Sequence, residues 1–447
     1  MKRIALFEDS GSDGLSPIAL MRPVFELVCG QFSLRERLIR CCEVAEWGAF
    51  VRSHLAETYR ESQPEAHVND SIWLSAAVTL LINGRWVPDA AAIRKLASAA
   101  DNEVGMLNDQ IVFLTLDPLE AALLEDVPWD ELLEQLAASR TAVDVSGTMI
   151  QHPWDLINHN GDQLSTDFQL RQFGHAAAPF GCQVSLGTQN VLGPDVAVIG
   201  NKSDLFVDKT ARIDPYVVLD ARHGPISINA GAVIQPFTRL EGPCHVGRDS
   251  QLFRANVREG TTVGPVCRVG GEVEESILHG FVNSYHDGFL GHSYVCPWVN
   301  MGALTTNSDL KNDYSNVRIP LSGDMIDTGS TKVGCFIGDH SKTALCSLFN
   351  TGSSIGLFGM VLPGGGLLPK HIPSFCRIWN GVLDDRVTLE AALTTARTAM
   401  GRRNEEFTPA QERLVRHLFE HTRAERETAV ERFAAKLQAR RENSVTA

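Results

Sequence analysis

Four side chains in the second half of the chain are of types that take part in proton transfer and anion binding. A histidine titrates near neutrality, so His286 can act as a general base. Asn300 follows fourteen residues later and can orient a bound polar group. Arg239 and Lys311 can hold an anion such as a phosphate, the arginine through two parallel hydrogen bonds. A fold that brings these residues together places a general base beside an anion-binding site.

A six-residue step of aliphatic residues predicts the fold that positions them. The step links Ile228, Ile234, Leu240, Val246 and Leu252. It recurs in three further registers, Val207-Ile213-Leu219, Val257-Val263-Val269 and Ile355-Val361-Leu367. A period of six fits neither a helix nor a single strand, but it fits triangular coils with three six-residue sides and inward aliphatic side chains. We therefore expect a left-handed parallel β-helix over residues 179–385. A β-sandwich with chance spacing is the alternative.

Residues 1–178 have the alternating pattern of a Rossmann-like α/β domain. Apolar runs at 4–7, 79–82 and 111–114 predict strands, and 33–46 and 128–138 have helical spacing. Ser33 with Glu36 three residues later is a helix-capping pattern. Elements in this order predict a mostly parallel sheet.

Residues 386–447 are charged and helix-prone. Thr408-Pro409-Ala410-Gln411 is a capping box with proline at the first helical position, and Leu414, Leu418 and Phe419 would form an apolar stripe. We expect a helical tail that covers the end of the β-helix or a neighbouring subunit. A disordered tail is the alternative.

Composition narrows the possible partners and location. The formal charge is −14 with no basic patch, which argues against nucleic-acid binding. No stretch has the apolar length of a membrane span or of a signal peptide. The ten cysteines include no Cys-x-x-Cys pair, so we expect reduced thiols and a cytoplasmic protein.

Two motifs resemble a known family of acetyltransferases. Residues 282–292 read Val-Asn-Ser-Tyr-His-Asp-Gly-Phe-Leu-Gly-His, and residues 299–303 read Val-Asn-Met-Gly-Ala. They resemble His-x-x-Tyr-Leu-Gly-Asp and Val-Asn-Ile-Gly-Ala-Gly-Thr of the bifunctional N-acetylglucosamine-1-phosphate uridylyltransferase/glucosamine-1-phosphate acetyltransferase family. The resemblance implies that His286 is the catalytic base, that Asn300 orients the substrate and that Ala303 lines the channel for acetyl-CoA.

Weaker matches extend the resemblance. Residues 236–240 read Pro-Phe-Thr-Arg-Leu, close to the family's Pro-Phe-Ala-Arg-Leu near the sugar phosphate, which implies substrate binding by Arg239. Residues 305–311 likewise imply substrate binding by Asn307 and Lys311. The resemblance also implies a homotrimer with active sites between subunits. Without it, His286 reads as a solvent-facing corner residue and Asn300 as one rung of an asparagine stack.

The chain departs from the family at three positions of the motif region. Phe289 stands where the family has a tyrosine, Glu274 where it has a lysine and His292 where it has an aspartate. Glu274 puts an anion beside the expected phosphate site. Either the acceptor differs from glucosamine-1-phosphate, or a cation such as Arg254 or Arg258 substitutes.

The N-terminal region resembles a divergent, alternative bacterial branch of sugar nucleotidyltransferases. The matching segments are residues 6–9, 20–27, 33–37, 83–85 and 153–155. The resemblance implies nucleotide binding by Arg22 and Arg35, with a nucleoside triphosphate and a sugar phosphate as substrates.

Nucleotidyl transfer is expected to use Mg²⁺, yet the ligands are not evident. The loop at residues 8–14 holds glycines that can form an anion nest, but it is acidic. Arg85 stands where the usual metal aspartate is expected, so Asp89 or Asp155 would have to serve.

Three functions stay open at this point. The first is a bifunctional transferase of sugar-nucleotide biosynthesis of the UDP-N-acetylglucosamine type. The second is an acyltransferase with a degenerate, sugar-nucleotide-binding or regulatory N-terminal domain. The third is a non-catalytic β-helix scaffold.

Overall fold

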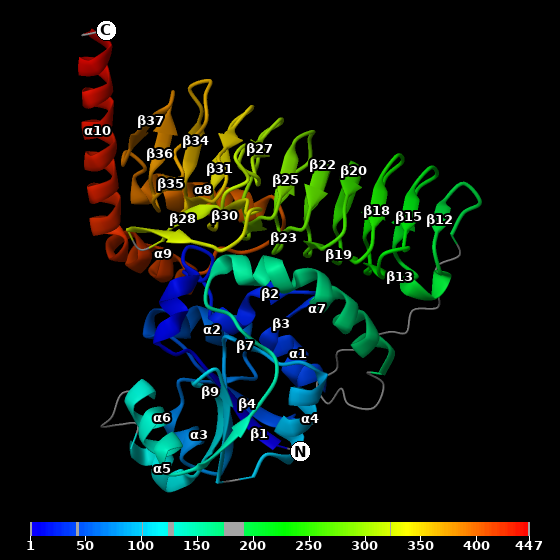
Figure 1. Ribbon diagram of the computed structural model, residues 1–447, viewed down its shortest axis with the longest axis vertical. Helices are drawn as coiled ribbons and strands as arrows, with labels where there is room; N and C mark the ends of the chain where they lie inside the picture. The colour runs from blue at the N-terminus through cyan, green and yellow to red at the C-terminus, as the bar shows by residue number, and fades with distance from the viewer. Residues whose placement is uncertain are drawn as a thin grey trace.

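The computed structural model describes residues 2–41, 44–100, 102–123, 129–173, 192–321 and 323–445. Figure 1 shows an α/β region beneath a long β-helix, with helices at the far end of that β-helix. The expected boundary between 178 and 179 lies outside the described residues. The α/β domain, the β-helix and the helical tail predicted from the sequence are all confirmed.

A seven-stranded sheet forms the centre of the N-terminal domain, in the order β10-β8-β9-β6-β1-β4-β5. Its strands are β1 (Lys2–Phe7), β4 (Val44–Phe50), β5 (His67–Val68), β6 (Thr79–Asn83), β8 (Glu103–Leu107), β9 (Gln110–Leu116) and β10 (Thr141–Asp144). β9 alone runs antiparallel to both of its neighbours. The remaining pairings are parallel, as the apolar runs predicted.

Helices cover this sheet and connect its strands. They are α1 (Leu34–Cys41), α2 (Ala56–Ser62), α3 (Ser71–Leu74), α4 (Ala90–Ser98), α5 (Pro118–Ala122), α6 (Trp129–Ala138) and α7 (Pro153–Phe173). The Ser33–Glu36 cap forms as predicted, with reciprocal backbone hydrogen bonds of 3.2 and 3.3 Å. The predicted helix 33–46 is too long, because residues from Val44 onward form β4 beside β1 in the middle of the sheet.

The β-helix has three sides of stacked parallel strands. One side, facing the N-terminal domain, comprises β13 (Leu205–Val207), β16 (Ile226–Ile228), β19 (Cys244–Val246), β21 (Thr261–Val263), β23 (Ile277–Leu278), β26 (Tyr294–Val295), β30 (Cys335–Ile337), β33 (Ser353–Ile355) and β35 (His371–Ile372). The second comprises β12 (Ala197–Ile199), β15 (Val218–Asp220), β18 (Arg239–Glu241), β20 (Gln251–Val257), β22 (Arg268–Glu274), β25 (Phe289–Gly291), β27 (Thr306–Asn307) and β32 (Leu348–Phe349).

The third side is built from shorter pairings and from the first halves of β20 and β22. Its own strands are β14 (Arg212–Ile213), β17 (Val233–Ile234), β24 (Asn283–Ser284), β31 (Lys342–Thr343), β34 (Met360–Leu362) and β36 (Arg377–Trp379). β37 (Val382–Asp384) turns back antiparallel on β36 and ends the β-helix. This closure leaves few free strand edges.

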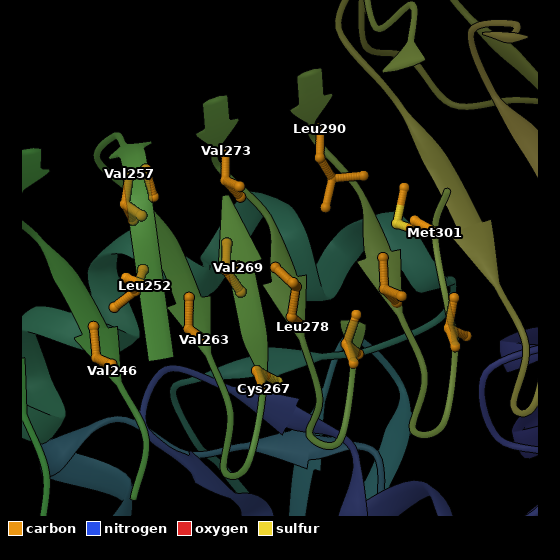
Figure 2. Close-up of a cluster of buried hydrophobic side chains, with 14 of the residues drawn as sticks. Val246, Leu252, Val257, Val263, Cys267, Val269, Val273, Leu278, Leu290 and Met301 are labelled. Atoms are coloured by element: carbon orange, nitrogen blue, oxygen red, sulfur yellow. The ribbon is translucent and has the colours of Figure 1, made fainter. Parts of the chain in front are cut away.

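An aliphatic column fills the β-helix (Figure 2). Ile228, Ile234, Leu240, Val246 and Leu252 are all fully buried, which confirms the six-residue step. The register predicted to end at Leu367 is wrong at that residue, which is 65% exposed, whereas Leu368 is buried. The glycines at 364–366 lengthen this turn by one residue and so change the phase of the step.

One insertion interrupts the coils between β27 and β30. It contains a hairpin of β28 (Arg318–Leu321) and β29 (Asp324–Asp327), where the six-residue step is absent from the sequence. Buried residues of the insertion, among them Val317 and Ile319, join a core with residues of the N-terminal domain.

The tail forms α8 (Leu389–Gly401), α9 (Pro409–His421) and α10 (Arg423–Val445). The capping box at Thr408 forms, and Leu414 and Leu418 are buried. Phe419 packs edge-on against Phe375 of the last coils at 5.0 Å between ring centroids. The tail therefore covers the end of the β-helix, as predicted.

Helix α7 joins the N-terminal domain to the β-helix (Figure 1). The buried Asn160 amide donates to the Gly260 carbonyl at 2.8 Å and to Thr262 Oγ1 at 3.0 Å. Arg22 adds a buried ion pair with Asp339. These hydrogen bonds and this ion pair join the N-terminal domain to the β-helix. Their buried polar groups therefore have partners, and the two domains pack directly against each other.

Candidate functional site

His286 lies exposed at a corner between β24 and β25. The coil register advances by 17 residues here, from Asn283 to Asn300 and from Phe289 to Thr306. The same step places Ala303 one coil below His286. The Leu304 N–H donates to the Asp287 carbonyl at 2.7 Å, which fixes the two corners against each other. The predicted base and the predicted cofactor-binding residue are therefore neighbours.

Asn300 lies directly below Asn283 on the third side. The Asn283 amide donates to Asn300 Oδ1 at 2.8 Å, so the two do form an asparagine rung. Asn283 of this rung precedes His286 by three residues on the same coil. An orienting role for Asn300 stays a prediction, and it is compatible with this position.

Lys342 continues the same column below Asn300. Its ammonium group donates to the Trp298 carbonyl, and burial lowers the pKa of Lys342 to about 8. The column therefore holds a partly deprotonated amine at mildly alkaline pH, which the sequence analysis did not identify.

Arg239 is not brought to His286 within one chain. Its strand precedes Phe289 by three coil steps, which at strand spacing corresponds to about 14 Å. Its guanidinium pairs with Asp220 at 2.7 Å and with Glu241. Hydrogen bonds from Arg222 and Arg239 hold the pKa of Asp220 well below its ordinary value.

Asn307 and Lys311 also make contacts within the chain. The buried Asn307 amide accepts from the Gly291 N–H at 2.9 Å and donates to the Gly291 carbonyl at 3.0 Å. Lys311 donates to the Asn316 carbonyl at 2.9 Å. Substrate binding by these residues stays a prediction, and for Asn307 the structure shows a side chain that holds the Leu-Gly segment in place.

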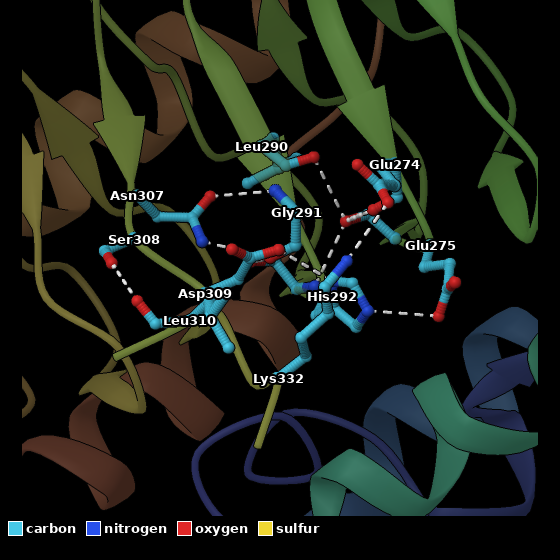
Figure 3. A network of polar contacts seen from close by, with 12 residues as sticks. Glu274, Glu275, Leu290, Gly291, His292, Asn307, Ser308, Asp309, Leu310 and Lys332 are labelled. Carbon is cyan, nitrogen blue, oxygen red and sulfur yellow. Dashed lines mark hydrogen bonds and ion pairs between the residues drawn. The ribbon is translucent and has the colours of Figure 1, made fainter. Parts of the chain in front are cut away.

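Glu274, which replaces the family lysine, is part of a polar network (Figure 3). Its carboxylate pairs with Arg258 at 2.8 Å and with Lys332 at 3.5 Å. Arg258 also lies within 3.8 Å of Glu241, Glu259 and Glu272. Acidic groups therefore outnumber cations around this face.

His292 belongs to the same network (Figure 3). Its Nδ1 contacts Asp309 at 2.8 Å and its Nε2 contacts Glu275 at 3.1 Å. Burial alone would lower the pKa of His292, but hydrogen bonds to Asp309 and Glu275 raise it to about 9. The imidazole is therefore charged at neutral pH and ties the insertion to the coils.

This raised pKa predicts a pH-dependent stability. The favourable interaction is fully present below the unfolded-state pKa near 6.5 and is lost as pH rises through about 9. Between these limits the free energy of unfolding should fall by roughly 3 kcal/mol more in the native protein than in His292→Gln. Urea unfolding at both pH values checks this; an identical fall in both proteins contradicts it.

In the N-terminal domain, Arg22 and Arg35 are both paired with carboxylates. Arg22 Nη1 lies 3.2 Å from Asp339 and donates to the Ile18 carbonyl at 2.7 Å. Arg35 pairs with Glu26, and both side chains are mostly buried. Nucleotide binding by these arginines stays a prediction, and a bound phosphate would have to displace the carboxylates.

The guanidinium group of Arg85 lies against the acidic loop at residues 8–14. Its guanidinium forms a two-point pair with Asp9 at 2.7 and 2.6 Å, and Asn83 donates to the same carboxylate at 2.7 Å. A Cβ on Gly11 would lie 2.4 Å from the Arg85 guanidinium carbon. The glycine of this loop therefore makes room for an arginine of the same domain.

The carboxylates proposed for Mg²⁺ have other partners. Asp89 accepts from the Ala91 and Ala92 N–H groups at the start of α4, and Asp155 accepts from two N–H groups before α7. Within the described ranges no group of three or more His, Cys, Asp and Glu side chains can hold a metal ion. Asp89 and Asp155 therefore each hold the start of a helix, and Mg²⁺ bound by one of them would take its other ligands from water and the substrate phosphates.

Comparison with known proteins agrees with the α/β domain described above. Residues 4–176 match the sugar nucleotidyl transferase family. A bifunctional sugar-1-phosphate nucleotidylyltransferase/acetyltransferase of Sulfurisphaera tokodaii is 32% identical over 93 residues, 21% of this chain and 23% of that protein. The bifunctional protein GlmU of Methylibium petroleiphilum is 31% identical over 162 residues, 35% of this chain and 30% of that protein.

The matched segments span less than a third of either curated relative. They confirm the resemblance expected from the motifs and support the prediction of a transferase. A solved UDP-N-acetylglucosamine acyltransferase of Arabidopsis aligns over 49% of this chain and 78% of that chain, at 13% identity and a TM-score of 0.25.

No helix among the described residues is long and apolar enough to cross a membrane. The residues that the sequence did not predict in the N-terminal domain and the β-helix are chiefly charged ones. Asp9 with Arg85, and Glu274 with Arg258 and Lys332, pair across long sequence separations. An arginine in place of the expected metal aspartate was the one signal that pointed to the first pair.

Proposed function

We propose that the β-helix transfers an acetyl group from acetyl-CoA to the amine of an amino sugar, in sugar-nucleotide biosynthesis of the UDP-N-acetylglucosamine type. The observation that carries this proposal is the exposed His286 one coil above Ala303, with the Asn283–Asn300 rung on the side that leads to this corner.

The chemistry requires a neutral amine. The amine nitrogen of the sugar attacks the thioester carbonyl, and His286 takes a proton from that amine. The tetrahedral oxyanion then collapses, the carbon–sulfur bond breaks, and the imidazolium returns the proton to the departing coenzyme A thiolate. Asn300 orients the sugar through its amide.

The negative charge around Glu274 limits where a phosphate group of the acceptor can lie. A phosphate at this face would meet the carboxylates that surround Arg258, so the network favours an acceptor whose phosphate lies elsewhere or is absent. Arg239 and Lys311 remain the proposed phosphate contacts for a phosphorylated acceptor.

An acceptor panel tests this function. The full chain, with radiolabelled acetyl-CoA, is offered glucosamine, glucosamine-1-phosphate and a nucleotide-linked amino sugar. We expect thiol release and a labelled sugar with at least one of them. Absence of transfer to every acceptor would support the non-catalytic scaffold instead.

Nucleotidyl transfer by the N-terminal domain is the second candidate, favoured by the family match over residues 4–176. The Asp9–Arg85 pair lies in the glycine-containing loop that is the candidate triphosphate cradle. Pyrophosphate release from a panel of nucleoside triphosphates and sugar-1-phosphates, with MgCl2 supplied, tests this activity. Release together with acetyl transfer demonstrates the bifunctional enzyme, and absence of release across the panel leaves a sugar-nucleotide-binding or regulatory domain.

We also propose a homotrimer in the cytoplasm. Large apolar side chains are exposed along the corner that carries His286, namely Tyr216, Phe237, Leu304 and Leu345. The sequence holds no Cys-x-x-Cys pair, which supports a reducing compartment. Light scattering should give three chains per particle, and Phe237→Ser should reduce that number; a native monomer contradicts the trimer.

A further inference from the structure

A large cleft opens between α10 and the last coils of the β-helix. Its volume is about 1190 Å³, and the insertion hairpin and one edge of the N-terminal domain complete its walls. Figure 1 shows α10 standing beside β37 at this end. The cleft is remote from His286 along the coils, and its volume is ample for one organic ligand.

The cleft has an apolar floor. Phe433 and Leu437 lie one turn apart on α10, and Leu368 and Leu383 face them from the β-helix. Leu367 lines the same cleft and is 65% exposed. An apolar surface this open is a common feature of ligand-binding grooves.

The charged residues of the cleft are mostly cationic, in a protein whose net charge is −14. Arg432 and Lys436 occupy successive turns of α10, and Lys370 lies on the opposite wall. Within the part of the chain that the structure describes, neither Arg432 nor Lys436 makes an ion pair with an acidic side chain. Of the two acidic lining residues, Glu425 is paired with His371 at 3.0 Å, which leaves Asp13.

We propose that this cleft binds an organic phosphate that carries an apolar chain. The cations of α10 and Lys370 hold the phosphate, since guanidinium and ammonium groups are the usual phosphate donors. The apolar chain lies on Phe433, Leu437 and the leucines of the last coils. The inference does not depend on the acetyl-transfer chemistry, because none of these residues belongs to that site.

Calorimetric titration of the full chain with decyl phosphate, kept dissolved as monomer, tests the proposal. We expect one molecule to bind per chain, with inorganic phosphate and decanol each weaker by about tenfold or more. The variant Arg432→Gln/Lys436→Gln should lose about tenfold in affinity, with unchanged melting temperature and acetyl transfer. Leu367→Ser should also weaken decyl phosphate but not inorganic phosphate.

The control variant is Lys209→Gln/Arg212→Gln, which removes two exposed cations at the far end of the β-helix. It should bind decyl phosphate as the native chain does. Three results overturn the proposal: equal affinity in the α10 variant and the native chain, equal affinity for phosphate and decyl phosphate, or binding only to phosphatidylglycerol vesicles and not to dissolved decyl phosphate.

Discussion

Replacement of His286 by alanine should lower the rate of acetyl transfer by about 10²–10⁴-fold. The imidazole is the side chain at this corner whose ordinary pKa lies near neutrality, so it is the group proposed to take the proton of the amine. The residue is exposed, so its loss should leave the melting temperature nearly unchanged. Thiol release from acetyl-CoA, measured at saturating acceptor, gives the comparison.

A control variant shows whether the loss of acetyl transfer is specific to His286 or follows from the removal of any exposed histidine. His223 is also exposed on the β-helix, but it lies several coils earlier. His223→Ala should retain native turnover. Native turnover in His286→Ala, or an equal loss in both variants, would remove His286 from the mechanism.

Replacement of Arg22 by alanine should destabilise the whole protein by about 3–5 kcal/mol. Asp339 is almost completely buried at the boundary between the domains, and without the guanidinium its charge has no compensation. Arg22 also contacts Cys296 Sγ at 3.5 Å, so three segments lose a shared partner. Urea unfolding at neutral pH measures the change.

A double variant distinguishes this structural role from nucleotide binding. Arg22→Met/Asp339→Leu removes both charges and should recover much of the lost stability, because an apolar pair needs no compensation. If Arg22 instead serves a phosphate, the single variant should keep native stability and lose nucleotide affinity. That outcome would contradict the ion-pair interpretation.

The sequence predicts the architecture because the relevant signals are periodic and local. The step from Ile228 to Leu252 determines the coils, and the Thr408 capping box marks the start of α9. The same step fails at Leu367, because the glycine run at 364–366 shifts the phase by one residue and Leu368 is buried instead. The insertion between β27 and β30 has no period from which to predict a hairpin.

The site is predictable only in part. His286 and Ala303 become neighbours because a constant coil step converts sequence spacing into position. Arg22 and Asp339 are 317 residues apart, and no local pattern predicts their contact. Glu274 departs from the family pattern, but only the structure shows that Arg258 and Lys332 converge on it.

The most direct measurement is the rate of acetyl transfer by the full chain in the presence of EDTA. We expect the labelled acetyl group to reach an amino sugar at the same rate with and without the chelator, since the residues of the β-helix corner supply the base and the binding groups. A chain that moves no acetyl group to any amino sugar, or that does so equally well with alanine at position 286, would contradict the account.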